Sequence, residues 1–223
     1  MHISEGLLSA KVCLAGYGIT GLITWYSLRK ISHSSDPTAG VPKAALLTAA
    51  FFVASSIRVP VPPASIHMVL NGLLGAVLDI YAFPAVLVGL LFQAVMFGHG
   101  GLSTLGINAV IMGIPALIAA QVFQWHQSLG RHLNRTLSLN LFGFLAGVIG
   151  IGLSCLLFLG ITILTIPSGF DAATEQTAIR GLTLVHIPLV IVEGIFTSMV
   201  VSFLYRVKPE LLISSPSSHE TSH

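Results

Sequence analysis

Charged residues are what this sequence most lacks. Only 8% of its 223 residues are charged, 54% are hydrophobic, and the mean hydropathy is +0.89. Soluble domains carry about 25% charged residues, so this composition excludes an ordinary soluble protein. A bilayer forces the backbone to satisfy its own hydrogen bonds, and helices do so. The sequence therefore predicts an all-α integral membrane protein.

Cysteine and catalytic motifs are scarce as well. The two cysteines, Cys13 and Cys155, lie in apolar runs and form no CxxC pair, which argues against a disulfide framework or a thiolate metal site. The chain has no GxxxxGK(S/T) motif to cradle ATP, no HExxH and no Ser/His/Asp pattern. We therefore do not expect an enzyme, and no nucleic-acid partner is expected.

Seven apolar segments are expected to form a transmembrane helix bundle. They cover residues 6–28, 44–56, 65–78, 85–97, 102–123, 137–166 and 181–205. The second, third and fourth are shorter than the ~20 residues of a standard span, so they must pack within protein or lie shallowly. The sequence thus predicts one transmembrane domain, residues 1–208, followed by a disordered Ser- and His-rich tail, residues 209–223.

The positions of the charged residues predict the orientation of the bundle, because basic residues concentrate in cytoplasmic loops. With seven spans, one side of the membrane receives Arg29, Lys30, Lys43, Arg131, Arg135, Arg206 and Lys208. The other side receives Arg58, Arg180, Glu5, Asp171 and Glu175. The first side is expected to be cytoplasmic. The amino terminus then lies outside and the carboxyl terminus, with its tail, lies in the cytoplasm.

The first two residues, Met1 and His2, can form a nitrogen chelate. The terminal amine, the His2 amide nitrogen and the His2 imidazole can all reach one metal ion, and they leave one position for a fourth ligand. Three in-line nitrogens favour a square-planar geometry, which suits Ni(II) or Cu(II). No basic region precedes the first apolar run, so no cleavable signal peptide is expected and Met1 should be retained.

Four of the nine histidines fall on the predicted outer side: His2, His67, His99 and His186. His67 follows a proline-rich connection, residues 58–63, that cannot be helical, and it is the favoured fourth ligand. His99 is interpreted as a loop or gating residue, and His186 as a satisfied core histidine.

The remaining polar residues are expected to serve the bundle or its surface. His33, His126 and His132 fall in inner loops and are interpreted as surface residues. Ser65 and Asn71 flank His67 closely enough to orient its ring. Glu193 lies near mid-membrane, where an unpaired charge is costly, so we expect it to hydrogen-bond a neighbouring helix.

Four ordered blocks within residues 1–205 carry a resemblance to a known family. They are Met-His-Ile-x-Glu-Gly at residues 1–6, the stretch Ser65–Gly75, the stretch His99–Asn108, and Ile-Pro-x-x-Ile-x-Glu-Gly at residues 187–194. Together they resemble the CbiM/NikM family, the substrate-binding membrane components of energy-coupling factor transporters for cobalt and nickel.

The resemblance implies a seven-helix protein of the bacterial or archaeal cell membrane, with its amino terminus tucked into the bundle. It implies that the metal is held by the Met1 amine, the His2 amide and imidazole, and His67. Around these ligands we expect Glu5, Ser65, Asn71 and His99.

The resemblance also implies the cargo and the partners. Ni²⁺ or Co²⁺ would be the transported substrate, with no organic cofactor. The expected partners are a transmembrane coupling subunit, cytoplasmic ATP-binding subunits that supply the missing P-loop, and a small accessory membrane subunit.

The sequence around His67 favours nickel. Cobalt-type members often show Ser-Cys-Ser-His-Pro-Thr-Gly there, whereas residues 64–71 of this chain read Ala-Ser-Ile-His-Met-Val-Leu-Asn, which looks like the nickel-type branch. Both ions can bind four nitrogens. Two alternatives stay open: a seven-helix receptor that senses metal or protons, and a secondary permease that works without an ATPase.

Overall fold

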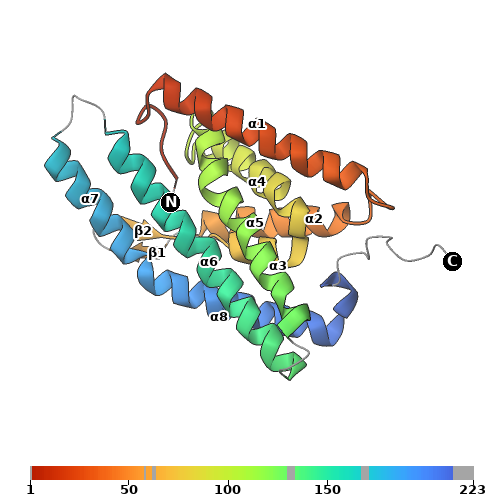
Figure 1. The fold of residues 1–223 in the computed structure, drawn as a ribbon. Coiled ribbons are helices and arrows are strands. Elements are labelled where there is room, and N and C mark those ends of the chain that lie inside the picture. Colours follow the sequence, from red (N-terminus) through yellow and green to blue (C-terminus); the bar gives the residue numbers. More distant parts are fainter. Residues whose placement is uncertain (1, 58, 62–63, 130–133, 167–170, 213–223) are drawn as a thin grey trace.

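The computed structural model describes residues 2–57, 59–61, 64–129, 134–166 and 171–212. Its α-helices and short strands follow one another along the chain as drawn in Figure 1. Their bounds are α1 Ala10–Ser32, α2 Val41–Ser56, β1 Val59–Val61, β2 Ala64–Ile66, α3 Asn71–Leu78, α4 Ala82–Phe97, α5 Leu105–Leu129, α6 Arg135–Leu164, α7 Ala172–Val185 and α8 Ile187–Val207. Two 3-10 helices, η1 Asp79–Tyr81 and η2 Pro209–Leu211, complete the described elements.

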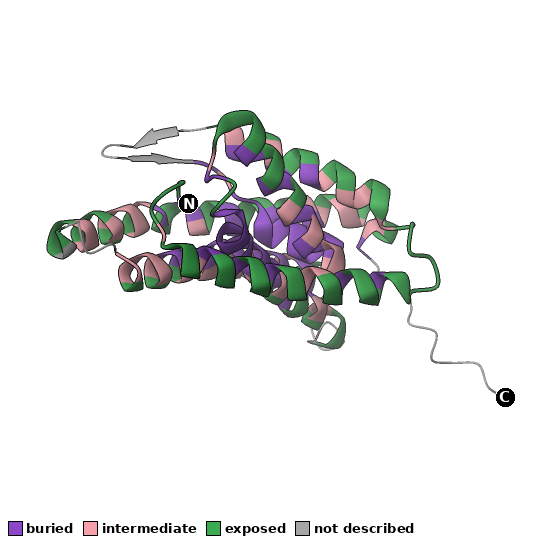
Figure 2. Ribbon diagram, turned by 90° about the horizontal axis from the view of Figure 1, so that it is seen from above, coloured by how far each residue is buried: buried purple, intermediate pink, exposed green. Residues whose placement is uncertain are grey.

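The core of the bundle lies around α5 and α3. α5 packs against α1, α3, α4 and α6, and α8 packs against α6. All eight residues of α3 are buried, and Figure 2 shows the buried residues gathered in the middle of the bundle. Small residues allow this close packing: a Cβ on Gly75 would stand 2.1 Å from the carbonyl oxygen of Ala116. The short third segment is therefore a core helix packed within protein, as expected.

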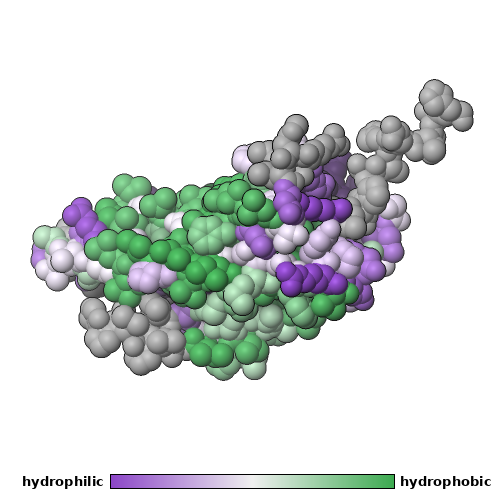
Figure 3. All heavy atoms as spheres, turned by 90° about the horizontal axis from the view of Figure 1, so that it is seen from below, coloured by the Kyte–Doolittle hydropathy of each residue, from purple (hydrophilic) through white to green (hydrophobic). Residues whose placement is uncertain are grey.

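The helices carry the apolar surface that a membrane requires. Four helical stretches are long and apolar enough to cross a bilayer: Asn71–Phe97, Leu105–Ser128, Arg135–Leu164 and Ala173–Val207. α2 is apolar but shorter. Figure 3 shows apolar side chains spread over a broad outer face, and contiguous apolar surface of this kind marks contact with a membrane. The predicted multi-pass membrane protein is confirmed.

The stretch from Asn71 to Phe97 reverses its direction. α3 and α4 meet at η1, where Asp79 has a positive φ of 51°. His67, which precedes α3, and Gln93, near the end of α4, both contact His2. Because both open ends of this hairpin lie beside the same residue, α3 and α4 run antiparallel and η1 lies at the far end of the bundle.

The structure corrects the expected helix start at Ser65. Residues 64–66 form β2, which pairs antiparallel with β1 so that Val59 lies opposite Ile66. Pro60, which lacks a backbone donor and cannot continue a helix, lies in β1 opposite Ser65. The helix begins only at Asn71, after Leu70 has turned the chain with φ 56°.

Two further bounds differ from the prediction. The last apolar segment was expected to start at residue 181, but helix already begins at Ala172, where Asp171 accepts a hydrogen bond from the Thr174 amide at 3.3 Å and so caps α7. The tail was expected to be disordered from residue 209. Instead, η2 forms over Pro209–Leu211, because Leu212 is buried and Lys43 Nζ donates to the Leu211 carbonyl oxygen at 2.9 Å. The rest of the tail, residues 213–223, lies outside the described residues.

Candidate metal centre

The amino-terminal segment is fixed against the start of α5 by a buried asparagine. The Ile3 amide donates to Asn108 Oδ1 at 2.9 Å, and Asn108 Nδ2 donates back to the Ile3 carbonyl oxygen at 3.1 Å. Thr104 Oγ1 donates to the same carbonyl oxygen at 2.9 Å. Ile3 is only 1% exposed. Both polar groups of the Ile3 backbone are thus satisfied, which fixes the position of the preceding residue, His2.

The His2 ring is oriented by a glutamine on α4. Gln93 Nε2 donates to Ser55 Oγ at 2.5 Å, which directs the amide oxygen Oε1 toward His2. This oxygen lies 2.7 Å from His2 Nε2. Because an amide oxygen only accepts, Nε2 must carry the ring proton. The second nitrogen, Nδ1, is then the one with a lone pair. It is also the one that can close a chelate ring with the His2 backbone amide.

His67 faces His2 from the connection between β2 and α3. The centroids of the two rings are 5.4 Å apart. His67 Nδ1 lies 3.2 Å from the Met68 carbonyl oxygen, so Nδ1 is the donor and Nε2 is the coordinating nitrogen. Two imidazoles from segments 65 residues apart in sequence thus lie side by side in the structure.

Both imidazoles are neutral at physiological pH. Burial lowers the pKa of His67 to about 3. Burial is also the largest cause that holds the pKa of His2 well below its usual range. A neutral ring keeps its lone pair, and a metal ligand needs that lone pair.

The loop between α4 and α5 covers His2. The His99 ring stacks on the His2 ring with centroids 5.7 Å apart. Glu5 ties this loop to the amino-terminal segment, because its Oε1 accepts from the Ser103 amide at 3.2 Å. Gly101 has φ +141°, and a Cβ on it would stand 1.8 Å from Glu5 Oε2. Only glycine leaves room for the Glu5 carboxylate here.

Asn71 holds α3 in place and does not orient the His67 ring. Its Nδ2, which has two protons, lies within hydrogen-bond distance of three acceptors: the carbonyl oxygens of Met112 and Gly150, at 3.1 and 3.0 Å, and Ser154 Oγ at 2.9 Å. These acceptors lie on α5 and α6. The expected role in orienting the ring is thus replaced by a role in anchoring the helix that follows it.

Three other residues that the sequence indicated are His186, Met1 and Ser65. His186 is 1% exposed, and its Nδ1 donates to the Leu182 carbonyl oxygen at 2.8 Å. Met1 lies outside the described residues, and so does the side chain of Ser65. Across the part of the chain that is described, no three His, Cys, Asp or Glu side chains gather to hold a metal ion.

Sequence reasoning missed Gln93, Ser55 and Thr104. Gln93 is fully buried and is the one amide side chain in the otherwise apolar expected segment 85–97. A lone polar residue in such a run must find a partner inside the bundle. That signal alone would have indicated Gln93, but its partner, 91 residues earlier, follows only from the fold.

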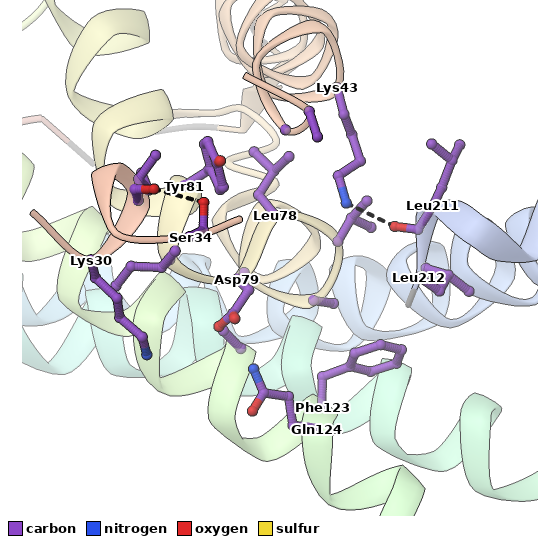
Figure 4. Close-up of a pocket in the computed structure, with 18 of the residues that line it drawn as sticks. Lys30, Ser34, Lys43, Leu78, Asp79, Tyr81, Phe123, Gln124, Leu211 and Leu212 are labelled. Carbon is purple, nitrogen blue, oxygen red and sulfur yellow. Dashed lines mark hydrogen bonds between the residues drawn. The ribbon is translucent and has the colours of Figure 1, made fainter. Parts of the chain in front are cut away.

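A cavity of about 510 Å³ lies at the other end of the bundle (Figure 4). It is lined by both apolar and polar residues at the ends of α1, α2 and α5 and at η1, and the polar ones include Lys30, Lys43, Asp79 and Tyr81. On α5, Asn108 of the metal centre and Phe123 of this cavity are about 22 Å apart at 1.5 Å per residue. The cavity is thus separate from the metal centre.

Comparison with known proteins gives a consistent likeness over nearly the whole chain. The family model described as "Cobalt uptake substrate-specific transmembrane region" (CbiM) matches residues 2–211. A Haemophilus influenzae protein, provisionally named a metal transport protein, is 35% identical over 95% of this chain and 97% of its own length. A Methanocaldococcus jannaschii protein, provisionally named cobalt transport protein CbiM, is 33% identical over 96% of this chain and 91% of its own length.

The fold is similar to that of solved structures as well. A crystal structure of a transition metal transporter superposes with a TM-score of 0.69 at 27% identity, covering 93% of each chain. A truncated transition metal transporter superposes with a TM-score of 0.68 at 26% identity, covering 92% of this chain and 99% of the other.

Proposed function

This chain belongs to the CbiM family of cobalt uptake transmembrane components, and on that premise we propose that it is the substrate-binding component of an ATP-driven importer for Ni²⁺ or Co²⁺. The observation that carries the proposal is the pair His2 and His67, whose rings lie 5.4 Å apart with a lone pair assigned to one nitrogen of each. Neutral imidazole nitrogens suit these ions.

The proposed ligand set is four nitrogens. Two are His2 Nδ1 and His67 Nε2, and the others are the His2 amide and the Met1 amine. The fixed Ile3 backbone supports this set, because a flexible terminus would lose entropy on binding whereas a fixed one has already lost it. A planar arrangement of four nitrogens favours nickel over cobalt.

We propose further that the helices make seven passes, α7 and α8 together forming the last, and that His2 faces outward. The charge distribution supports this orientation. Arg29, Lys30, Lys43, Arg135, Arg206 and Lys208 all belong to the helix ends at the cavity side of the bundle. Basic residues on this scale mark the cytoplasmic side.

The chain needs partners to use ATP, because it carries no P-loop of its own. The proposed partners are a transmembrane coupling subunit and cytoplasmic ATP-binding subunits, with a small accessory membrane subunit. Co-purification of the chain with an ATPase and a second membrane subunit is the expected result. Metal uptake by the chain alone in proteoliposomes would instead indicate a secondary permease.

Equilibrium dialysis of the purified chain with Ni²⁺ tests the site. His67→Ala should lose the fourth ligand and weaken binding by about 100-fold, the upper range for loss of a metal-site group. His33→Ala is the matched control, because His33 is exposed at the opposite end of α1 and, among the described residues, its ring hydrogen-bonds only the helix end at Arg29 and Ser32. Equal affinities for both variants would contradict the proposed site. The same dialysis with Co²⁺ measures the preference between the ions.

A further inference from the structure

We infer that Glu193 of α8 is a positioning residue for His67: its carboxylate holds the backbone segment that presents this imidazole to the metal. The inference rests on the proposed function, because it concerns the same site. It adds a residue that makes no contact with the metal and that lies on a helix other than those that contact His2.

Both carboxylate oxygens of Glu193 bind the chain just after His67. Oε1 accepts from the Val69 amide, and Oε2 accepts from the Leu70 amide at 3.0 Å. Glu193 is fully buried. A buried carboxylate is costly inside a membrane protein unless hydrogen bonds satisfy it. The two amides supply charge-assisted bonds, and the carboxylate fixes the two residues in return.

The segment held by Glu193 is conformationally demanding. Leu70 has φ 56°, the left-handed region that residues other than glycine seldom adopt. This residue turns the chain from the extended stretch around His67 into the first turn of α3. Such a conformation persists only where the surroundings enforce it. Glu193 bonds the amide of this same residue, so it acts where the direction of the segment is set.

The other end of the segment is already immobile. Asn71 is bonded to α5 and α6, and a Cβ on Gly72 would stand 2.4 Å from the Ala146 carbonyl oxygen. With α3 fixed in this way, the two Glu193 bonds determine how the four residues from His67 to Leu70 are placed. Through them, the position of α8 determines the position of the metal ligand.

Glu193→Gln tests the inference. The amide side chain keeps one acceptor and puts a donor against the second backbone N–H, so the segment should be released. Ni²⁺ affinity measured by dialysis should fall by about 10-fold to 100-fold, the range for residues that support metal ligands. The visible absorption of the Ni²⁺-loaded variant should match that of the wild type, because the four nitrogen ligands are unchanged.

Thr197→Val is the matched control. Thr197 lies one turn further along α8 and is equally buried, and within the described residues its hydroxyl has no hydrogen-bond partner. Its substitution should leave Ni²⁺ affinity within about twofold. If Glu193→Gln does not yield folded protein by size-exclusion chromatography, Glu193→Asp keeps the charge but withdraws the oxygens, and it should give an intermediate loss of affinity.

The double variant Glu193→Gln/His67→Ala separates positioning from a general structural effect. The residual affinity of His67→Ala comes from the terminal chelate, so adding Glu193→Gln should lower it no further. An equal loss in both backgrounds would overturn the inference, and so would a Glu193→Gln affinity within twofold of the wild type. If His67→Ala itself bound Ni²⁺ normally, the proposed function would fail instead.

Discussion

The two ends of the bundle handle polar groups in opposite ways. At the end near His2, the buried polar side chains of Gln93, Thr104 and Asn108 are directed at residues 2 and 3. At the opposite end, charged residues such as Lys30, Lys43 and Asp79 stand beside apolar ones around a cavity, with the Asp36 loop exposed. Both ends are built from the same helices, and α5 runs through both. The difference shows that the buried side chains of Gln93, Thr104 and Asn108 serve to hold residues 2 and 3.

The contrast has an energetic cause. A buried polar group destabilises the fold unless it is hydrogen-bonded, so Gln93, Thr104 and Asn108 each require a fixed partner. The backbone of Ile3 and the ring of His2 provide those partners. The amino-terminal segment and the helices therefore depend on one another, whereas the polar groups at the cavity end can be hydrated independently. Metal affinity should accordingly respond to substitutions at the first end only.

The largest expected effect is that of pH on metal binding. The pKa of His67 is about 3 and that of His2 is well below its usual range. Protonation of these rings should therefore contribute little to a loss of binding between pH 7 and pH 6. The proposed Met1 amine and His2 amide must each release a proton, so Ni²⁺ affinity should fall by about 100-fold between pH 7 and pH 6. Dialysis at several pH values measures this slope. A flat profile above pH 5 would indicate a site made of imidazoles alone.

A smaller loss is expected from Asn108→Ala. This substitution leaves the Ile3 amide buried without its acceptor, so the terminal segment should loosen and Ni²⁺ affinity should fall by about tenfold. Isothermal titration calorimetry can measure the change. Asn140→Ala on α6 is a matched control, because Asn140 is only partly buried and its Oδ1 has no partner in the described structure. Equal losses of Ni²⁺ affinity in Asn108→Ala and Asn140→Ala would contradict the role of Asn108 in holding the Ile3 backbone.

His99→Ala should have a weaker effect still. His99 stacks on His2, at a centroid distance of 5.7 Å, so its loss should remove this ring contact. Stacked ring pairs contribute about 0.5–1.5 kcal/mol, so Ni²⁺ affinity should fall by about threefold to tenfold. If this variant lost all binding while His67→Ala kept it, the ligand assignment would be wrong.

Tyr81→Phe at the cavity end should leave metal affinity unchanged. The Tyr81 hydroxyl donates to the Pro37 carbonyl oxygen at 3.1 Å, and loss of one such bond should lower the free energy of unfolding by about 1 kcal/mol. A small decrease in melting temperature with an unaltered Ni²⁺ titration is the expected pair of results. A change in affinity would show that the two ends are coupled.

The sequence was sufficient to predict the helical membrane fold, because hydropathy is a property of local sequence. The positions of the basic residues placed His2 and His67 on the same predicted side, and their rings lie 5.4 Å apart in the structure. Their role as metal ligands stays a prediction. The partners of the two imidazoles could not be predicted, since Gln93 and Asn108 reach residues 2 and 3 across about 90 to 105 positions of sequence. Glu193 was expected to bond a neighbouring helix. Its carboxylate accepts hydrogen bonds from two backbone amides because Leu70 turns the chain with a left-handed φ, and no sequence pattern predicted this turn.

The strand pair and the early start of α7 were missed for a related reason. Residues 64–66 are apolar enough to join the following helix, but the paired strand keeps them extended. Asp171 caps α7 within a stretch whose polarity resembled a loop. Capping and pairing are decided by partners and override local composition.

Acetylation of the Met1 amine tests the central claim most directly. The terminal amine would then become an amide nitrogen without a free lone pair for the metal, and no new amine would replace it, while the helices would keep every described contact. Equilibrium dialysis of the acetylated protein with Ni²⁺, beside the unmodified protein and with size-exclusion chromatography to confirm folding, is the decisive measurement. The account predicts a folded protein that has lost most of its Ni²⁺ binding. Undiminished binding by the acetylated protein would contradict it.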